Sequence, residues 1–218
     1  MNKYSVLIGL LLLSVISKAQ SIIQKPIIFD EERKALSMAY LNERYSMVQD
    51  EPTIVPQMVV VHWTVIPTFE ASFRTFNQAR LPSSRAGIQS AGALNVSSQY
   101  MIDRDGTIYQ LLADTTFARH VIGLNHCAIG IENIGGTKDL PMTAAQLKSN
   151  IELIRMLSGK HDIKYVIGHH EYKTFIGHEL WKEKDPNYLT VKSDPGDQFM
   201  NDIRNSIKDL GLKGPIKK

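Results

Sequence analysis

Three segments that lie far apart in the sequence each carry side chains that can bind a metal ion. They are VVVHWT with His62, VIGHH with His169 and His170, and KSDPG with Asp194. Two imidazoles and one carboxylate make a three-ligand tetrahedral zinc site, whose open fourth position can hold a water molecule. Zinc lowers the pKa of that water to about 7, which gives a hydroxide nucleophile at neutral pH. The residue types therefore predict zinc-dependent hydrolysis.

The two histidine segments each follow an apolar run of strand length. His62 is near the end of the run at 57–64, and His169 follows the run at 164–167. Ligand sites in open α/β sheets lie at strand ends, which favours His62 and His169 as a pair of ligands. Taken alone, His62 would also fit a hydrogen-bonded core histidine. Adjacent residues in extended backbone point in opposite directions, so only one of His169 and His170 can face the metal. The preceding Gly168 favours His169.

Asp194 and Lys192 lie together in the KSDPG segment. Asp194 precedes Pro195, so it also fits the N-cap of a last helix with proline at the first helical position. A carboxylate can serve both roles, one oxygen for zinc and one for a backbone amide. Lys192 would place an ammonium beside the metal, where it could stabilise an oxyanion, or it could be an ordinary solvated lysine. Lys-Asp-Pro also occurs at 184–186, so the tripeptide alone is not specific.

Glu132 lies in a run of small and apolar residues at 128–134. An unpaired buried carboxylate is costly, so this position requires either a surface-facing side chain or a functional site. If Glu132 faces the metal, it can act as general base for the water and then as acid for the leaving amine.

The hydrophobic pattern predicts alternating strands and helices. Helices are expected at 30–46, 70–83, 144–158 and from 194 onward, strands at 57–64, 98–102, 107–112, 128–134 and 164–167, and a loop at 82–95. The strands at 98–102 and 107–112 flank an Asp-Gly turn, which is a hairpin signal. The expected fold class is α/β, a single domain in which the hairpin makes the sheet mixed.

The helix at 144–158 has the clearest end signals. Thr143 and Gln146 match the T-x-x-Q capping box at its start. Gly159 is expected to end the helix in the C′ position, where glycine tolerates a left-handed backbone.

The N-terminus has the layout of a secretory signal peptide. Lys3 is followed by an apolar stretch at 6–16 and by small residues that place cleavage after Ala19. About 11 apolar residues are too few for a membrane anchor, because a spanning helix needs roughly 20. The protein is therefore expected to be exported, periplasmic or secreted, with no stable membrane span after cleavage. We divide the chain into a signal peptide (1–19), an N-terminal extension with one helix (20–55), a catalytic domain (56–212) and a polar tail (213–218).

Composition and the remaining motifs exclude several other classes. A formal charge of +3 is too small to indicate a nucleic-acid partner. The chain has no H-E-x-x-H, G-x-S-x-G or phosphate-binding glycine loop. The single cysteine, Cys127, is expected to be buried. The other histidines have no metal-like spacing and are expected to be surface or structural residues; they are His120, His126, His161 and His178.

Five segments together resemble the zinc N-acetylmuramoyl-L-alanine amidase and peptidoglycan recognition protein superfamily. They are VVVHWT, YMIDRDGTIYQLL, RHVIGLNHCAIGIENIGG, VIGHHEY and KSDPG, in the order found in that family, and they cover about residues 56–200. Five ordered matches are far more specific than any one of them.

The resemblance implies a central mixed β-sheet flanked by helices, with Zn2+ in a surface groove. It implies that His62, His169 and Asp194 bind the zinc, that Glu132 is the catalytic acid/base, and that Lys192 is the lysine of the K-x-D-P-G motif. The implied reaction cleaves the amide between the lactyl group of N-acetylmuramic acid and L-alanine, in peptidoglycan or in soluble muropeptides. The alternative is a peptidoglycan-binding or sensing module of the same fold that does not cut.

Two features depart from the family pattern. Many members have Tyr-His or Ala-His before the hairpin, where this chain has Ser98-Gln99. Glu132 must then carry the proton transfer. The connection at 171–190 is also longer than the minimal pattern; with Trp181, it could either wall the groove or pack as a surface loop.

Overall fold

A six-stranded mixed sheet forms the centre of the protein in the computed structural model, which describes residues 21–217. The strand order is β1-β4-β3-β5-β2-β6, and only the β3–β4 hairpin is antiparallel. The strands are β1 (Ile22–Gln24), β2 (Met58–Trp63), β3 (Tyr100–Ile102), β4 (Ile108–Gln110), β5 (Ala128–Asn133) and β6 (Tyr165–Gly168). The predicted α/β class and the mixed sheet are confirmed. The proposed signal peptide at 1–19 lies outside the described residues.

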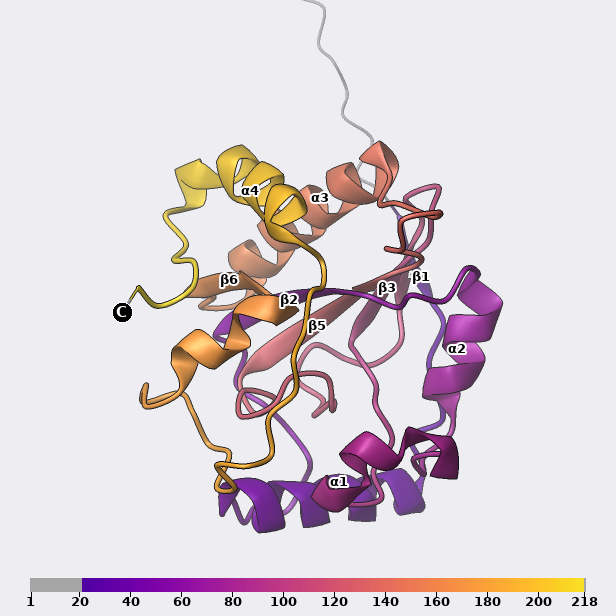
Figure 1. Cartoon of the computed structure of the whole chain (residues 1–218), viewed down its shortest axis with the longest axis vertical. Coiled ribbons are helices and arrows are strands. Elements are labelled where there is room, and N and C mark those ends of the chain that lie inside the picture. The colour runs from indigo at the N-terminus through magenta and orange to yellow at the C-terminus, as the bar shows by residue number, and fades with distance from the viewer. Residues whose placement is uncertain (1–20, 218) are drawn as a thin grey trace, which may run out of the picture.

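Helices cover both sides of this sheet. The α-helices are α1 (Glu31–Tyr45), α2 (Phe69–Asn77), α3 (Ala144–Lys160) and α4 (Asp197–Ser206), and the 3-10 helices are η1 (Ser83–Ala91), η2 (His169–Phe175) and η3 (Lys208–Leu210). Figure 1 shows α3 and α4 side by side on one side of the sheet and α1 on the opposite side. The single domain with its sheet between helix layers follows from this arrangement.

The central strands β2 and β5 are buried along almost their whole length. Val59, Val60 and Val61 of β2 are fully buried, as are Ile129 and Ile131 of β5. A strand covered on both faces reads as a continuous apolar run, which is why the sequence signal for β2 was strong. Such burial also fixes the register, because a slip by one residue would turn every side chain to the other face.

Side chains cap the starts of two helices, and the sequence predicted one of these caps, the box at the start of α3. Asp30 caps α1 and accepts a hydrogen bond from the Arg33 N–H at 2.9 Å. In α3, Thr143 Oγ1 accepts the Gln146 N–H at 3.0 Å, and Gln146 Oε1 accepts the Thr143 N–H at 3.0 Å. The capping box is therefore confirmed, and it fixes where α3 begins on the sheet.

Other predicted element ends are wrong. The helix expected at 70–83 ends at Asn77, because Gln78 is already extended, and the loop expected at 82–95 contains the 3-10 helix η1. Gly159 does not end α3: the helix continues to Lys160, and His161 leaves it in an extended conformation. The His161 N–H still bonds to the Leu157 carbonyl at 2.8 Å, so no left-handed residue is needed at this end.

Two glycine substitutions should change stability in opposite directions. Gly136 has φ +95°, and a Cβ there would lie 2.3 Å from the Trp63 ring, so Gly136→Ala should lower the free energy of unfolding by roughly 2 kcal/mol or more. Gly159 is inside α3, and a Cβ there would have no atom within 4 Å. Gly159→Ala should therefore raise the free energy of unfolding by about 0.5–1 kcal/mol. Urea denaturation of both variants measures this. A destabilised Gly159→Ala protein would mean that α3 ends in the left-handed manner after all.

Candidate metal centre

The two candidate histidine ligands and Glu132 lie at the carboxyl ends of three adjacent strands. β2 is parallel to β5 on one side and to β6 on the other, with His62 opposite Glu132 and Val61 opposite Gly168. His169 follows Gly168 directly, so it continues from the end of β6. The register of the sheet therefore brings these side chains to one edge, where sites in parallel sheets form.

His62, His169 and Asp194 converge on one point. His62 Nδ1 is 2.9 Å from His169 Nδ1, and Asp194 Oδ2 is 3.0 Å from His169 Nδ1 and 3.4 Å from His62 Nδ1. The three residues are at most 7% exposed. Two ring nitrogens and one carboxylate oxygen thus face one another in a space that a single cation could fill.

Asp194 is not the N-cap of the last helix, as the sequence had suggested. Helix α4 begins at Asp197, and Gly196 is its N-cap without a side-chain hydrogen bond. The carboxylate of Asp194 is instead turned to His169, and its carbonyl accepts hydrogen bonds from both the N–H and the Nδ1 of His170, each at 2.9 Å. The Asp-Pro pattern predicted that Asp194 caps the helix, but its contacts with His169 and His170 hold it in another position.

His170 faces away from the point where the three ligand atoms meet. Its Nδ1 contacts the Asp194 carbonyl and its Nε2 lies 2.9 Å from Asp197 Oδ1. Both ring nitrogens are therefore engaged on the α4 side of the 191–196 segment. Of the two adjacent histidines, His169 is the one that the structure brings to the cluster.

The protonation states of the cluster suit a cation. Burial lowers the pKa of His62 to about 4 and also lowers the pKa of His169, so both rings are neutral at pH 7. Burial alone would raise the pKa of Asp194, but its contacts with His169 and His62 together outweigh burial and hold the pKa well below its usual range. Neutral imidazoles and an ionised carboxylate are the forms that bind zinc. The residues present therefore fit the metal.

Glu132 is buried and faces this cluster rather than the outer surface. Its side chain lines the same cleft as His62 and Asp194, and its Oε2 has no hydrogen-bond partner among the described residues. Burial raises the pKa of Glu132 to about 8, and the negative charge of Asp194 adds to the effect. Perturbed carboxyl groups of this kind are typical of catalytic sites.

The cluster lies in a cleft with two lobes. The larger lobe has a volume of about 260 Å³ and contains all three candidate ligands, Glu132 and Arg85. The smaller lobe, about 60 Å³, extends toward α1 and the 188–192 segment. Both lobes share His120, His169 and Lys192 together with two apolar residues, Ile88 and Val96. Lys192 is partly exposed and lines both lobes.

The sequence of this chain matches a known protein family. The family model described as N-acetylmuramoyl-L-alanine amidase matches residues 51–197, about two thirds of the chain. The chain belongs to the N-acetylmuramoyl-L-alanine amidase family. No curated protein sequence matches it.

Solved structures show the fold of this amidase-family chain in other proteins. The amidase LysC from Clostridium intestinale URNW is 19% identical, with a TM-score of 0.52 over 88% of this chain and 99% of that one. The endolysin amidase LysCS from the same organism is also 19% identical, with a TM-score of 0.53 over 90% and 99%. Peptidoglycan recognition protein-LE, solved in complex with tracheal cytotoxin, is 19% identical, with a TM-score of 0.50 over 77% and 89%.

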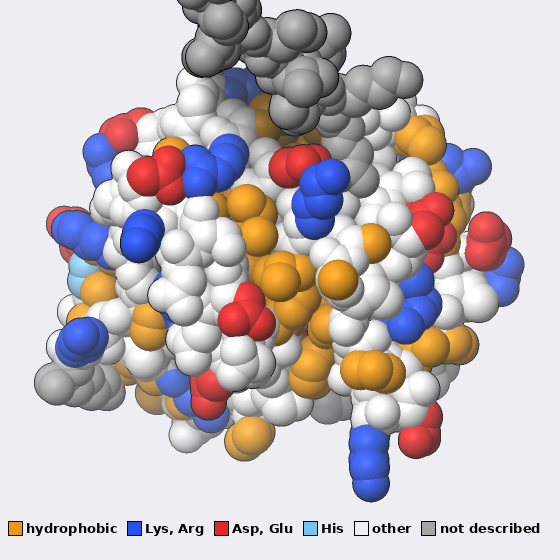
Figure 2. All heavy atoms as spheres, turned by 90° about the horizontal axis from the view of Figure 1, so that it is seen from above, with side chains coloured by type: hydrophobic (Ala, Val, Ile, Leu, Met, Phe, Trp, Pro, Cys, Tyr) orange, Lys and Arg blue, Asp and Glu red, His pale blue; other side chains and the backbone are white. Residues whose placement is uncertain are grey.

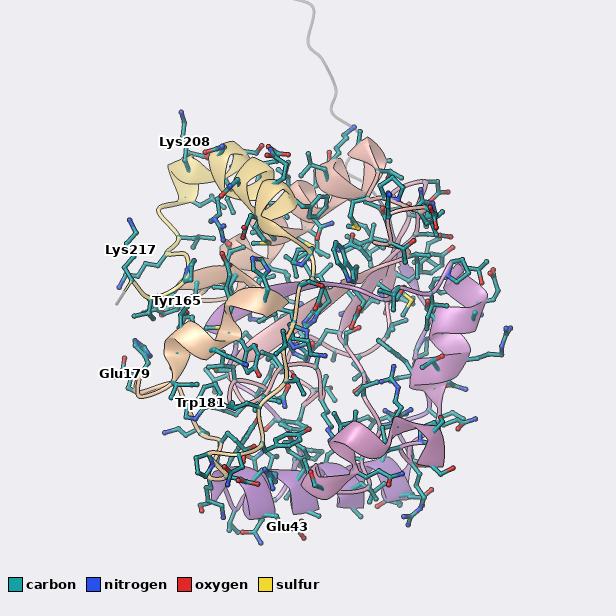
Figure 3. All side chains as sticks on the ribbon, viewed as in Figure 1. Glu43, Tyr165, Glu179, Trp181, Lys208 and Lys217 are labelled. Carbon is teal, nitrogen blue, oxygen red and sulfur yellow. The ribbon has the colours of Figure 1, made fainter. Side chains whose placement is uncertain are left out.

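The long connection at 171–190 of the amidase-family chain both packs on the protein and borders the cleft. Trp181 covers Gly123 and stacks near Tyr172, and Figure 3 shows it toward the left edge of the molecule. Tyr188 and Thr190 line the smaller lobe, where the Tyr172 hydroxyl donates to the Thr190 carbonyl at 2.7 Å. Part of this segment therefore packs as a surface loop, around Trp181, and another part forms a wall of the cleft, at Tyr188 and Thr190.

One residue of the cluster was missed by sequence reasoning. His120 is buried, with its Nδ1 3.0 Å from His62 Nε2 and its Nε2 3.1 Å from the Ala128 carbonyl. A signal was present in Gly130, since a glycine inside a strand indicates close approach of another group. A Cβ at Gly130 would lie 2.9 Å from the His120 ring.

The surface of the amidase-family chain carries charges of both signs. Figure 2, seen from the side of α3 and α4, shows hydrophobic side chains in the middle of this face with basic and acidic groups mixed around them. Among residues 21–217, no helix is long and apolar enough to cross a membrane.

The raised pKa of Glu132 predicts a pH dependence of stability in the metal-free protein. The folded state holds this proton more tightly than the unfolded state, so the favourable contribution is complete below about pH 4.5 and is lost as the pH rises through about 8. Relative to Glu132→Gln, which cannot titrate, the wild type should lose on the order of a few kcal/mol across this window. Urea denaturation at a series of pH values measures the difference.

A matched control for this experiment is Glu43→Gln, on the exposed surface of α1 (Figure 3). Its stability relative to wild type should not change with pH in the same way. A parallel pH profile for wild type and Glu132→Gln would contradict the burial of an uncompensated carboxyl group.

Proposed function

We propose that this chain is an exported zinc-dependent N-acetylmuramoyl-L-alanine amidase, acting on peptidoglycan or its soluble fragments. The observation that carries the proposal is the convergence of His62, His169 and Asp194 beside the buried Glu132 in a cleft. Membership of the amidase family supports the choice of substrate.

Zinc would be held by the two neutral imidazoles and the carboxylate, a donor set of nitrogen and oxygen that this ion favours. Bound there, it would supply Lewis-acid chemistry: it would polarise the scissile carbonyl and make a water molecule more acidic. The three candidate ligands come from a strand, the start of η2 and the 191–196 segment, which supports a site that is formed before any ion binds.

Glu132 would move the proton in the reaction. It takes a proton from the water that attacks the carbonyl carbon, and it returns that proton to the amine nitrogen as the C–N bond breaks. The products are the lactyl carboxylate of the sugar and the free amine of L-alanine. A carboxyl group with a pKa near neutrality suits both steps, and a cation bound close by lowers the value of about 8.

Lys192 would stabilise the negative charge that develops on the carbonyl oxygen. The proposal is supported by Lys192 lining both lobes of the cleft while staying partly exposed, since an ammonium there would act on a developing negative charge. Arg85 contributes a second positive charge on the wall of the larger lobe. These two cations also favour a substrate that carries carboxylates, as the peptide stems of cell walls do.

Export is proposed from the signal-peptide pattern at 1–19, which places the enzyme in the periplasm or outside the cell. We keep 20–55 as an N-terminal extension of a catalytic domain at 56–212, with a polar tail at 213–218. Both elements of the extension pack on this domain: β1 pairs with β4, and α1 contributes Tyr40, Leu41 and Tyr45 to the main hydrophobic core.

Zinc content should separate the proposed ligands from their neighbours. His62→Ala, His169→Ala and Asp194→Ala should each lower the bound zinc well below one ion per chain, because two remaining ligands hold the ion poorly. His170→Gln is the matched control and should keep full zinc, since this ring faces α4. Elemental analysis by mass spectrometry after dialysis gives the stoichiometry. Full zinc in His169→Ala would show that the ligand set is wrong.

Product analysis tests the reaction itself. Incubation of the mature, zinc-loaded protein with muropeptides should release stem peptides that begin with L-alanine, and a chelator should stop the release. Glu132→Gln should keep its zinc and lose turnover by about 10²–10⁴-fold, the usual effect of a lost general acid/base. Mass spectrometry of the products measures both. Intact muropeptides from a zinc-loaded wild type would instead favour the binding module.

A further inference from the structure

The ring of His120 lies between a candidate zinc ligand and a backbone carbonyl. Its Nε2 is 3.1 Å from the Ala128 carbonyl oxygen, and its Nδ1 is 3.0 Å from His62 Nε2. A carbonyl oxygen only accepts hydrogen bonds, so His120 Nε2 must carry the hydrogen. In a neutral ring the other nitrogen is then an acceptor, and His62 Nε2 must be the donor to it.

We propose that His120 is a positioning residue that holds His62 in the tautomer with a free electron pair on Nδ1. This inference rests on the zinc site proposed above, because its consequence is that Nδ1 of His62 is ready to bind the metal. The other tautomer would place a hydrogen on Nδ1, pointing at the cation, and would set two electron pairs against each other between His62 and His120. The order of contacts from Ala128 through His120 to His62 therefore decides which nitrogen faces the site.

The contacts of Asp194 agree with this assignment. Its Oδ2 approaches His169 Nδ1 to 3.0 Å, within hydrogen-bond distance, but stays 3.4 Å from His62 Nδ1. His62 Nδ1 also lies 2.9 Å from His169 Nδ1, where a nitrogen without a hydrogen can accept a hydrogen bond. His169 is free of this constraint, so its Nδ1 can hold the hydrogen until a metal replaces it.

The fold holds both the backbone and the ring of His120 in place. Its backbone N–H donates to Asn125 Oδ1 at 2.8 Å, and Asn125 Nδ2 donates to the Tyr45 hydroxyl of α1 at 2.9 Å. Gly130 of β5 leaves the space that the ring occupies, since a Cβ there would lie 2.9 Å from it. The ring is buried, so water does not compete for its two nitrogens. A histidine built in this way acts on the metal through its neighbour, as partners of ligand histidines generally do.

The tautomers can be measured directly in the metal-free wild type. Long-range ¹H–¹⁵N correlation spectra of the histidine rings should show hydrogen on Nε2 for both His62 and His120, with the His62 signals assigned from a His62→Gln spectrum. Hydrogen on Nδ1 of His62 would overturn the proposal. This measurement needs neither bound metal nor a substituted His120, so it stays decisive if a variant fails to fold or if the wild type binds no zinc. A wild type that binds no zinc would overturn the proposed function but would leave the tautomer assignment unaffected.

Zinc affinity tests the consequence. His120→Phe keeps a ring but loses both polar contacts, and it should raise the Kd for zinc by roughly 10–100-fold. His120→Gln can offer an oxygen to His62 and an N–H to Ala128, so it should stay within about threefold of wild type. His178→Phe is the control and should not change the Kd, because this ring packs edge-on against Tyr165 and Phe175 and takes no part in the contacts that hold His120.

Competition with a chelator of known affinity measures these constants, and the absorption spectrum of the cobalt-substituted protein reports the ligand geometry. The spectrum of His120→Phe should shift while that of His120→Gln matches wild type. A Kd for His120→Phe equal to that of wild type, or a His120→Gln protein as weak as His120→Phe, would overturn the proposal.

Discussion

The parallel register of β5, β2 and β6 is the constraint on which the candidate site depends. It sets His62 opposite Glu132 and brings β6 to its end beside Val61, so that His169 emerges next to His62. Because the strands are buried on both faces, their apolar side chains fix this register strongly. A slip by one residue would turn His62 into the core and separate it from Glu132. The hydrophobic core therefore determines the chemistry at its edge.

Electrostatics at this edge explain why the cluster suits a cation. Asp194 brings a buried negative charge, while burial keeps both imidazoles neutral and gives Glu132 a raised pKa. Buried charges are costly unless they are paired, and among the described residues the carboxylate faces two rings that carry no full charge. A divalent ion would compensate Asp194 and would lower the pKa of Glu132 by its positive charge. The positive charge of a bound ion would thus both stabilise the cleft and bring the pKa of Glu132 closer to neutrality.

The sequence predicted what local patterns determine and missed what tertiary contacts decide. The buried strands and the start of α3 follow from β-branched runs and from the Thr143–Gln146 capping box. Asp194 carries a local N-cap signal that contacts with His169 and His170 override. His120 lies 58 residues from His62 in the sequence, and no spacing rule joins two residues that meet across a sheet. Family motifs indicated the ligands because they record such contacts indirectly.

His120 also connects the N-terminal helix α1 to the candidate metal site. A series of polar contacts runs from Tyr45 of α1 through Asn125 and the backbone of His120 to the ring of His62. Figure 1 shows α1 on the side of the sheet opposite α3 and α4, and Tyr40 of this helix also lines the smaller lobe of the cleft. Its influence passes through the segment that ends in β5. A helix that provides no candidate ligand then helps to determine which nitrogen of His62 is offered to the metal, because the protein positions a ligand through the neighbours of that ligand.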